Sequence, residues 1–134
     1  MNSLYYLPWI PALLIMLSTM IAVYSLSKPK IFTLAKYLYY AAAGIVALML
    51  ICLLMAFVTG KFQYSYVYHY SSVDLPVLYR IAAVWAGQEG SIALWTFFIM
   101  IVGIIAVNRE EQLKQSFLTI VGLVSLIFVI HCIN

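Results

Sequence analysis

Four long apolar runs divide this chain of 134 residues, and they constrain its fold more than any other feature. The runs occupy about residues 4–26, 37–59, 91–107 and 117–133, and short polar stretches separate them. A helix needs about 20 apolar residues to cross a bilayer core, so each run is close to the length of one crossing. Because a spanning segment must satisfy its backbone groups internally, the expected fold is all-α.

The composition favours a polytopic integral membrane protein. Hydrophobic residues make up 66% of the chain and charged residues only 8%, whereas a soluble domain has about 25% charged residues. No stretch is left for a soluble domain, so residues 1–134 are expected to form a single transmembrane domain. The first run has no basic region in front of it, which predicts a retained span and not a cleaved signal peptide.

The longest polar stretch, residues 61–90, is expected to be an outer loop followed by an interfacial helix. Tyrosines alternate with other residues over 64–70, a pattern that fits either a short extended stretch or an irregular aromatic loop. Asp74 and Pro76 predict the start of a helix, with the Asp74 carboxylate accepting hydrogen bonds from its first amides. We expect this helix to bend at Gly87–Gly90 and to continue as the third span.

The distribution of cations predicts the topology. Five of the seven lie in the segments 27–36 and 108–116, against Lys61 and Arg80 in the segment 61–90. Positive charge favours the cytoplasmic side, which places both termini and residues 61–90 outside the cytoplasmic (inner) membrane. The cations are scattered between apolar runs, so they are interpreted as topology determinants and not as a nucleic-acid site. Membrane lipid is an expected partner of the whole chain.

The segment Leu75–Trp95 carries the most information about function. It places Glu89 at the mouth of a span, where an ionisable group is costly and often functional. Trp85 and Glu89 are four residues apart and would share a helix face. Arg80 is too far from Glu89 to pair with it on one straight helix. From physics alone an equally good alternative is that Arg80 reaches lipid headgroups and Glu89 forms hydrogen bonds at the interface.

This segment also resembles a known family. The pattern Leu75-Pro76…Tyr79-Arg80…Trp85-Ala-Gly-Gln-Glu-Gly-Ser91…Leu94-Trp95 is similar to the N-terminal signature of the CcmF-type cytochrome c biogenesis proteins, the membrane haem lyase subunits of the haem-handling protein superfamily. Gln88 stands where the family commonly has His, so the resemblance implies no haem ligand there. The chain ends before the family's tryptophan-rich loop, so we expect the N-terminal part of a split lyase or a shortened relative.

The resemblance implies a membrane subunit that scaffolds haem delivery and covalent attachment to apocytochrome c on the extracytoplasmic side. The implied partners are a second lyase chain with the tryptophan-rich loop, a haem chaperone and apocytochrome c. Haem is the implied cofactor of the complex. The candidate residues that face haem or a partner are Arg80, Trp85 and Glu89, and the candidate partner-binding residues are Tyr79, Gln88 and Trp95. Arg80 would pair with a haem propionate.

Other chemistry finds little support in the sequence. His69 and His131 are the only histidines that could ligate haem, and neither lies in a ligand motif. Cys52 and Cys132 have no metal or redox spacing, and no catalytic constellation is present, so the chain is not expected to be catalytic alone. The alternative function is a small scaffold or proton-path subunit of a respiratory membrane complex, with Glu89 as the proton relay group.

Overall fold

Helices account for all the regular structure in the part of the chain that the computed structural model describes, residues 9–109 and 113–133. In chain order the elements are α1 (Trp9–Ser25), the short 3-10 helix η2 (Pro29–Ile31), α2 (Phe32–Val58), α3 (Ser65–Tyr70), α4 (Val77–Ala83), α5 (Gln88–Arg109) and α6 (Lys114–Ile133). The expected all-α fold is confirmed.

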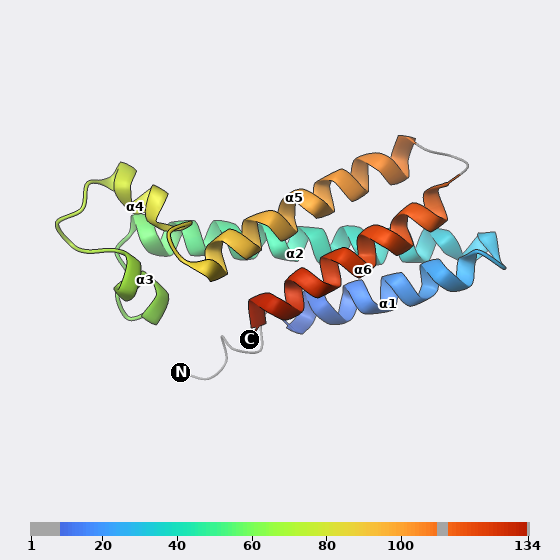
Figure 1. Cartoon of the computed structure of the whole chain (residues 1–134), viewed down its shortest axis with the longest axis horizontal. Coiled ribbons are helices and arrows are strands. Elements are labelled where there is room, and N and C mark those ends of the chain that lie inside the picture. Colours follow the sequence, from blue (N-terminus) through green and yellow to red (C-terminus); the bar gives the residue numbers. More distant parts are fainter. Residues whose placement is uncertain (1–8, 110–112, 134) are drawn as a thin grey trace.

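The four long helices pack together as a bundle (Figure 1). Helix α1 lies against α2 and α6, and α5 lies against α6 and α2. The two short helices α3 and α4 lie together beyond the end of α2, where α5 begins. We call this end of the bundle the motif end, and the end that holds η2 and the start of α6 the cationic end.

Three helices are long and apolar enough to cross a membrane, namely Pro29–Val58, Gln88–Arg109 and Lys114–His131. Helix α1 is also apolar, with 17 residues in its described part. Two helices begin earlier than the apolar runs suggested: α2 at Phe32 instead of about 37, and α5 at Gln88 instead of about 91. The polar residues Thr33 and Lys36 fit within α2 because helical geometry pairs their backbone groups as well as it does those of apolar residues. The crossing itself stays a prediction for all four helices.

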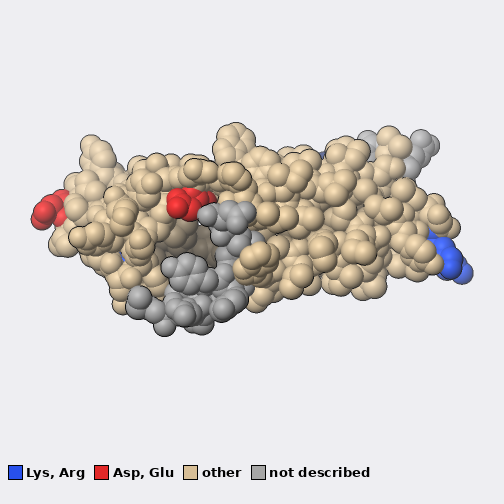
Figure 2. All heavy atoms as spheres, turned by 60° about the horizontal axis from the view of Figure 1, so that its bottom comes forward, with Lys and Arg blue, Asp and Glu red and all other residues tan. Residues whose placement is uncertain are grey.

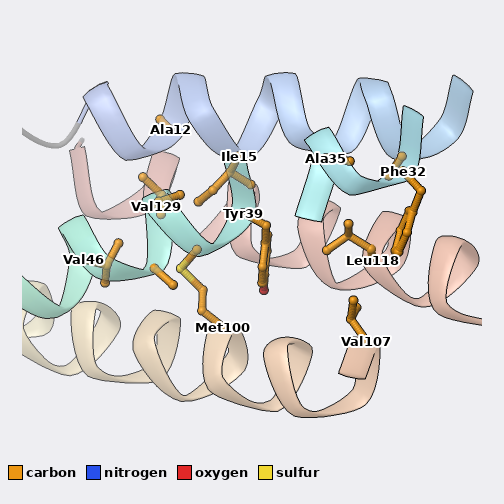
Figure 3. Close-up of a cluster of buried hydrophobic side chains, with 13 residues drawn as sticks. Ala12, Ile15, Phe32, Ala35, Tyr39, Val46, Met100, Val107, Leu118 and Val129 are labelled. Carbon is orange, nitrogen blue, oxygen red and sulfur yellow. The ribbon is translucent and has the colours of Figure 1, made fainter. Parts of the chain in front are cut away.

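Small side chains allow the long helices to approach closely. The buried residues of α1 and α2 include Ala12 and Ala22 on one side and Ala35, Ala42 and Ala43 on the other. In lipid, helix association depends on such close packing more than on the hydrophobic effect. Larger side chains fill the centre, where Tyr39 and Met100 are fully buried (Figure 3).

Two hydrogen bonds connect the helices within this apolar core. The hydroxyl of Ser18 in α1 donates to the carbonyl oxygen of Ala35 in α2 at 2.8 Å. The Tyr39 and Ser125 hydroxyls, from α2 and α6, lie 3.3 Å apart. Such interhelical bonds contribute on average about 0.6 kcal/mol in a membrane protein. Their main effect is therefore to determine which faces of α1, α2 and α6 pack together, and their contribution to the stability of the bundle is small.

Charge is distributed unevenly between the two ends of the bundle, with five of the seven cations at one end and Lys61 and Arg80 at the other. The cationic end holds Lys28, Lys30, Lys36, Arg109 and Lys114. The two acidic residues that the structure describes, Asp74 and Glu89, both belong to the segment at the motif end. On the face that Figure 2 shows, the acidic groups lie far from the basic groups of the opposite end. The apolar surface between them is the part suited to lipid.

Replacement of Gly122 by alanine should destabilise the bundle. A methyl group at Gly122 would collide with the Thr19 hydroxyl of α1, which donates to the Ile15 carbonyl. Overpacking of this kind typically costs about 1–3 kcal/mol. We expect a lower unfolding midpoint for Gly122→Ala in detergent, followed by circular dichroism.

Gly44→Ala is the matched control, because nothing lies within 4 Å of a methyl group placed there. This variant should unfold at the wild-type midpoint or above it. Equal midpoints for the two variants would contradict the close packing of α1 against α6.

Candidate functional site

A turn at Gly60 ends α2 and connects it to the segment of the motif end. Gly60 adopts a left-handed conformation with φ of 63°. The amide of Gly60 donates to the Phe57 carbonyl and that of Lys61 to the Ala56 carbonyl. This pair of bonds is the Schellman arrangement, which favours glycine because other residues are strained at positive φ. It reverses the chain so that α3 packs back on the last turns of α2.

The tyrosine-rich segment is a helix over Ser65–Tyr70, so both the extended stretch and the aromatic loop considered for residues 64–70 are wrong. In helix α3, Tyr66 and Tyr70 are four residues apart and therefore share a face, with ring centroids 5.0 Å apart. The Tyr66 ring also meets Phe57 of α2 edge-on at 5.4 Å. Phe57 and Tyr66 belong to a second apolar cluster, together with Val67, Ala83 and Val84.

Helix α4 begins without the predicted cap. It starts at Val77 after Pro76, and no side chain caps it, so the capping role given to Asp74 is wrong. Instead, the Arg80 side chain reaches back to the loop in front of the helix. Its Nε donates to the Leu75 carbonyl at 2.9 Å and its Nη2 to the Val73 carbonyl at 2.6 Å. Arg80 therefore holds the 73–75 loop against α4.

The chain breaks between α4 and α5, and the Tyr66 hydroxyl connects the two sides of the break. It donates to the carbonyl oxygen of Val84 at 2.8 Å and accepts from the amide of Gly90 at 3.1 Å. The Gly90 amide is one of the first amides of α5, which have no partner inside the helix. One phenol thus satisfies a backbone donor and a backbone acceptor that the break leaves unpaired.

The small residues of the Trp85–Ser91 block fit this connection closely. A β-carbon at Gly87 would lie 2.5 Å from the Tyr66 ring, and one at Gly90 would collide with the Val84 carbonyl oxygen. The Ser91 hydroxyl donates to the Trp85 carbonyl at 3.0 Å. Two glycines and a serine are therefore required for the shape of the turn itself. The expected bend is present, and it lies at residues 84–87, slightly earlier than Gly87–Gly90.

The environment of Tyr66 keeps its phenol protonated. Burial raises the pKa of Tyr66, hydrogen bonding from the Gly90 amide opposes this, and the negative charge of Glu89 raises the pKa further. The ordinary tyrosine pKa is about 10. The hydroxyl therefore keeps, at neutral pH, the proton that it donates to Val84.

A polar contact connects the block to the last helix of the bundle. The Gln88 amide nitrogen lies 3.0 Å from Nε2 of His131 in α6. For this contact to be a hydrogen bond, the amide donates and the imidazole accepts at Nε2, with its own proton on Nδ1. Gln88 thus ties the start of α5 to the far end of α6.

The structure places the six predicted site residues in three settings. Tyr79, Trp85 and Trp95 are exposed on α4, in the turn and on α5. Arg80 is half-buried against the loop, and Gln88 and Glu89 occupy the exposed first turn of α5. Trp85 and Glu89 do not share a helix face, because the turn separates them. An acidic group in the first turn of a helix is electrostatically favourable.

The two histidines that could ligate haem each have a local polar contact. His69 Nδ1 lies 3.1 Å from the Ser65 carbonyl of its own helix, and His131 Nε2 faces Gln88. Residues 9–109 and 113–133 hold no group of three or more His, Cys, Asp or Glu side chains arranged for a metal ion. The Arg80 donors face backbone carbonyls. No haem chemistry is therefore assigned to this chain alone.

Similarity to known proteins agrees with the motif. A cytochrome c-type biogenesis protein of Rhodobacter capsulatus is 32% identical over 94 residues, which cover 67% of this chain and 14% of that protein. The CcmF protein of Haemophilus influenzae is 26% identical over 128 residues, covering 89% of this chain and 20% of the relative. The Escherichia coli CcmF is 35% identical over 82 residues, covering 58% and 13%.

This chain is related to the CcmF-type cytochrome c biogenesis proteins. The resemblance drawn from the Trp85–Ser91 block is thereby confirmed. The chain spans no more than a fifth of the length of these relatives, so it corresponds to only a part of such a protein, as expected. No protein-family model matches the chain. No solved structure matches it either.

Sequence reasoning missed Tyr66 as the residue on which the block depends. The sequence showed Tyr66 as one of the alternating tyrosines of residues 64–70, and it did not predict the contact with residues 84–90. The alternation of tyrosines obscured the signal, because only a helical reading puts Tyr66 and Tyr70 on one face. His131 was considered as a haem ligand, and its contact with Gln88 was not foreseen.

Removal of the Tyr66 hydroxyl should loosen the α4–α5 turn. Tyr66→Phe leaves the Val84 carbonyl and the Gly90 amide without their partner. A buried polar group left unpaired costs about 1–3 kcal/mol, so amide exchange over residues 84–91 should accelerate by roughly 5- to 150-fold. Hydrogen–deuterium exchange with mass spectrometry measures this directly.

Tyr68→Phe serves as the control, since the Tyr68 side chain is 68% exposed on the other face of α3. Its exchange pattern at residues 84–91 should match that of the wild-type protein. If Tyr66→Phe also leaves the pattern unchanged, the phenol does not hold the turn.

Proposed function

We propose that this chain is a membrane subunit of a haem lyase that matures cytochrome c on the extracytoplasmic side of the inner membrane. The single observation that supports this most directly is the intact Trp85–Ser91 block, held in a defined turn by Tyr66. The relatives are named as cytochrome c-type biogenesis proteins, which supports the same process. The chain contributes a helical scaffold and an outer docking surface, and not the chemistry of attachment.

In this proposal the motif end faces outward. Five cations lie at the cationic end against Lys61 and Arg80 at the motif end, and the positively charged end favours the cytoplasm. Both termini and residues 61–90 are then extracytoplasmic. Apocytochrome c, the haem chaperone and a second lyase chain with the tryptophan-rich loop would all meet the chain on that side.

The docking surface consists of Tyr79, Trp85 and Trp95, whose side chains are exposed on consecutive elements. Aromatic side chains of this kind are enriched at protein interfaces because they combine a large apolar area with a polar tip.

Arg80 remains the candidate for contact with a haem propionate, which would require its guanidinium to leave the Val73 and Leu75 carbonyls. Gln88 and Glu89, which are exposed in the first turn of α5, are the candidates for contact with hydrogen-bond donors of a partner.

A proton-path subunit of a respiratory complex receives less support. Glu89 is exposed in the first turn of α5. The buried polar side chains of the described bundle are hydroxyls, such as Ser18, Thr96 and Ser125, and a proton relay across a membrane uses ionisable groups.

The proposal is tested by gentle detergent extraction of the tagged chain and mass spectrometry of the proteins that co-purify. We expect a large membrane protein with a tryptophan-rich loop, or a haem chaperone. Recovery of respiratory subunits in their place would refute the lyase assignment.

Truncation of Tyr79 should weaken the docking surface without affecting the fold. Tyr79→Ala removes a side chain that is 66% exposed, and loss of an aromatic anchor from an interface typically costs about 1–2 kcal/mol or more. We expect recovery of the partner chain, and the level of covalent cytochrome c in cells, to fall several-fold.

Tyr37→Ala is the matched control, because Tyr37 is 65% exposed but belongs to the first turns of α2, at the cationic end. It should leave both measurements at the wild-type level. Equal effects of the two variants, or none from Tyr79→Ala, would argue against a docking surface at the motif end.

A further inference from the structure

The connection between α1 and α2 carries positive charge with no acidic residue nearby in sequence. Lys28, Lys30 and Lys36 fall within nine residues, and the first acidic residue of the whole chain is Asp74. The other connection at this end is different, since Glu110 and Glu111 accompany Arg109 and Lys114 there. The uncompensated charge is thus confined to the α1–α2 turn.

The geometry of the turn keeps the lysine donors available. Pro29 is the first residue of the 3-10 helix η2, and the lysines on either side of this proline, Lys28 and Lys30, are both exposed. The Lys28 ammonium lies 5.5 Å from the centre of the Tyr24 ring. A ring face attracts an ammonium without occupying its N–H groups as a carboxylate does. The Tyr24 ring therefore holds the Lys28 ammonium in place, and its N–H groups are still able to donate hydrogen bonds to an anion.

Exposed apolar side chains lie directly beside this charge. Tyr24 and Leu26 at the end of α1 are each 52% exposed, and Leu34 in the first turn of α2 is 53% exposed. A free phosphate would use only the ammonium groups. A phospholipid would use both features, with its phosphate on the lysines and its acyl chains along the apolar ends of α1 and α2.

We propose that the α1–α2 turn binds the headgroup of an anionic phospholipid, with Lys28 and Lys30 as the phosphate-binding groups. Anionic headgroups attract cations placed next to membrane-spanning helices. Among the described residues of the motif end the cations are Lys61 and Arg80, and the Arg80 side chain is bound to the Val73 and Leu75 carbonyls, so no pair of available cations is found there. This inference is independent of the lyase function.

The test compares lipid binding by the full chain in detergent, measured by native mass spectrometry. The probes are phosphatidylglycerol and phosphatidylcholine with identical acyl chains. We expect a preference for phosphatidylglycerol, and a loss of about fivefold in that preference for each of Lys28→Gln and Lys30→Gln, as follows from about 1 kcal/mol of attraction per cation near an anionic surface. Inorganic phosphate at millimolar concentration should not displace the lipid.

Lys61→Gln is the control and should bind phosphatidylglycerol as the wild-type chain does. The proposal is overturned if the two lipids bind equally, if the Lys28 and Lys30 variants keep the preference, or if Lys61→Gln loses it to the same degree. Displacement by inorganic phosphate would also overturn it, since the turn would then be a site for free anions. Both target lysines are exposed in a turn, so unchanged circular dichroism should accompany the loss of binding.

Discussion

The need to pair every backbone amide and carbonyl near a membrane determines the form of this protein. Long helices meet this need within each segment, but a break in a helix exposes groups that must find other partners. The break between α4 and α5 exposes the Val84 carbonyl and the Gly90 amide, and Tyr66 satisfies both. Because Tyr66 belongs to α3, the position of α3 and the shape of the α4–α5 turn depend on each other.

Close packing makes this solution specific. The turn contacts the Tyr66 ring at Gly87 and the Val84 carbonyl at Gly90 with no space for a side chain. The same principle applies inside the bundle, where Gly103 contacts the Tyr39 hydroxyl group and Gly122 contacts Thr19. Glycine in a helix costs about 1 kcal/mol relative to alanine in water. Here that cost is offset by contacts that a larger residue would prevent.

The sequence predicted the helical membrane fold, the approximate helices and the bend near Gly87 because these depend on local signals: hydropathy, proline and glycine. It did not predict that residues 65–70 are helical. A segment of six residues is too short for its pattern to distinguish a strand from a helix, and contact with α2 determines which of them forms. Nor did the sequence predict the Tyr66 and Gln88–His131 contacts, which join residues 18 to 43 positions apart. Such contacts follow from the packing of whole helices, and a sequence pattern does not contain them.

The Trp85–Ser91 block therefore contains residues that the turn requires and residues that are available for docking, and its sequence alone does not separate the two. Gly87, Gly90 and Ser91 form the turn, through space and through the bond from Ser91 to the Trp85 carbonyl. The aromatic rings of Trp85 and Trp95 contribute little to that geometry and are exposed. The fold does not explain why an exposed residue that the turn does not need should be a tryptophan, but contact with a partner protein would. A docking role consequently rests on the tryptophans, whereas the glycines and the serine are explained by the fold itself.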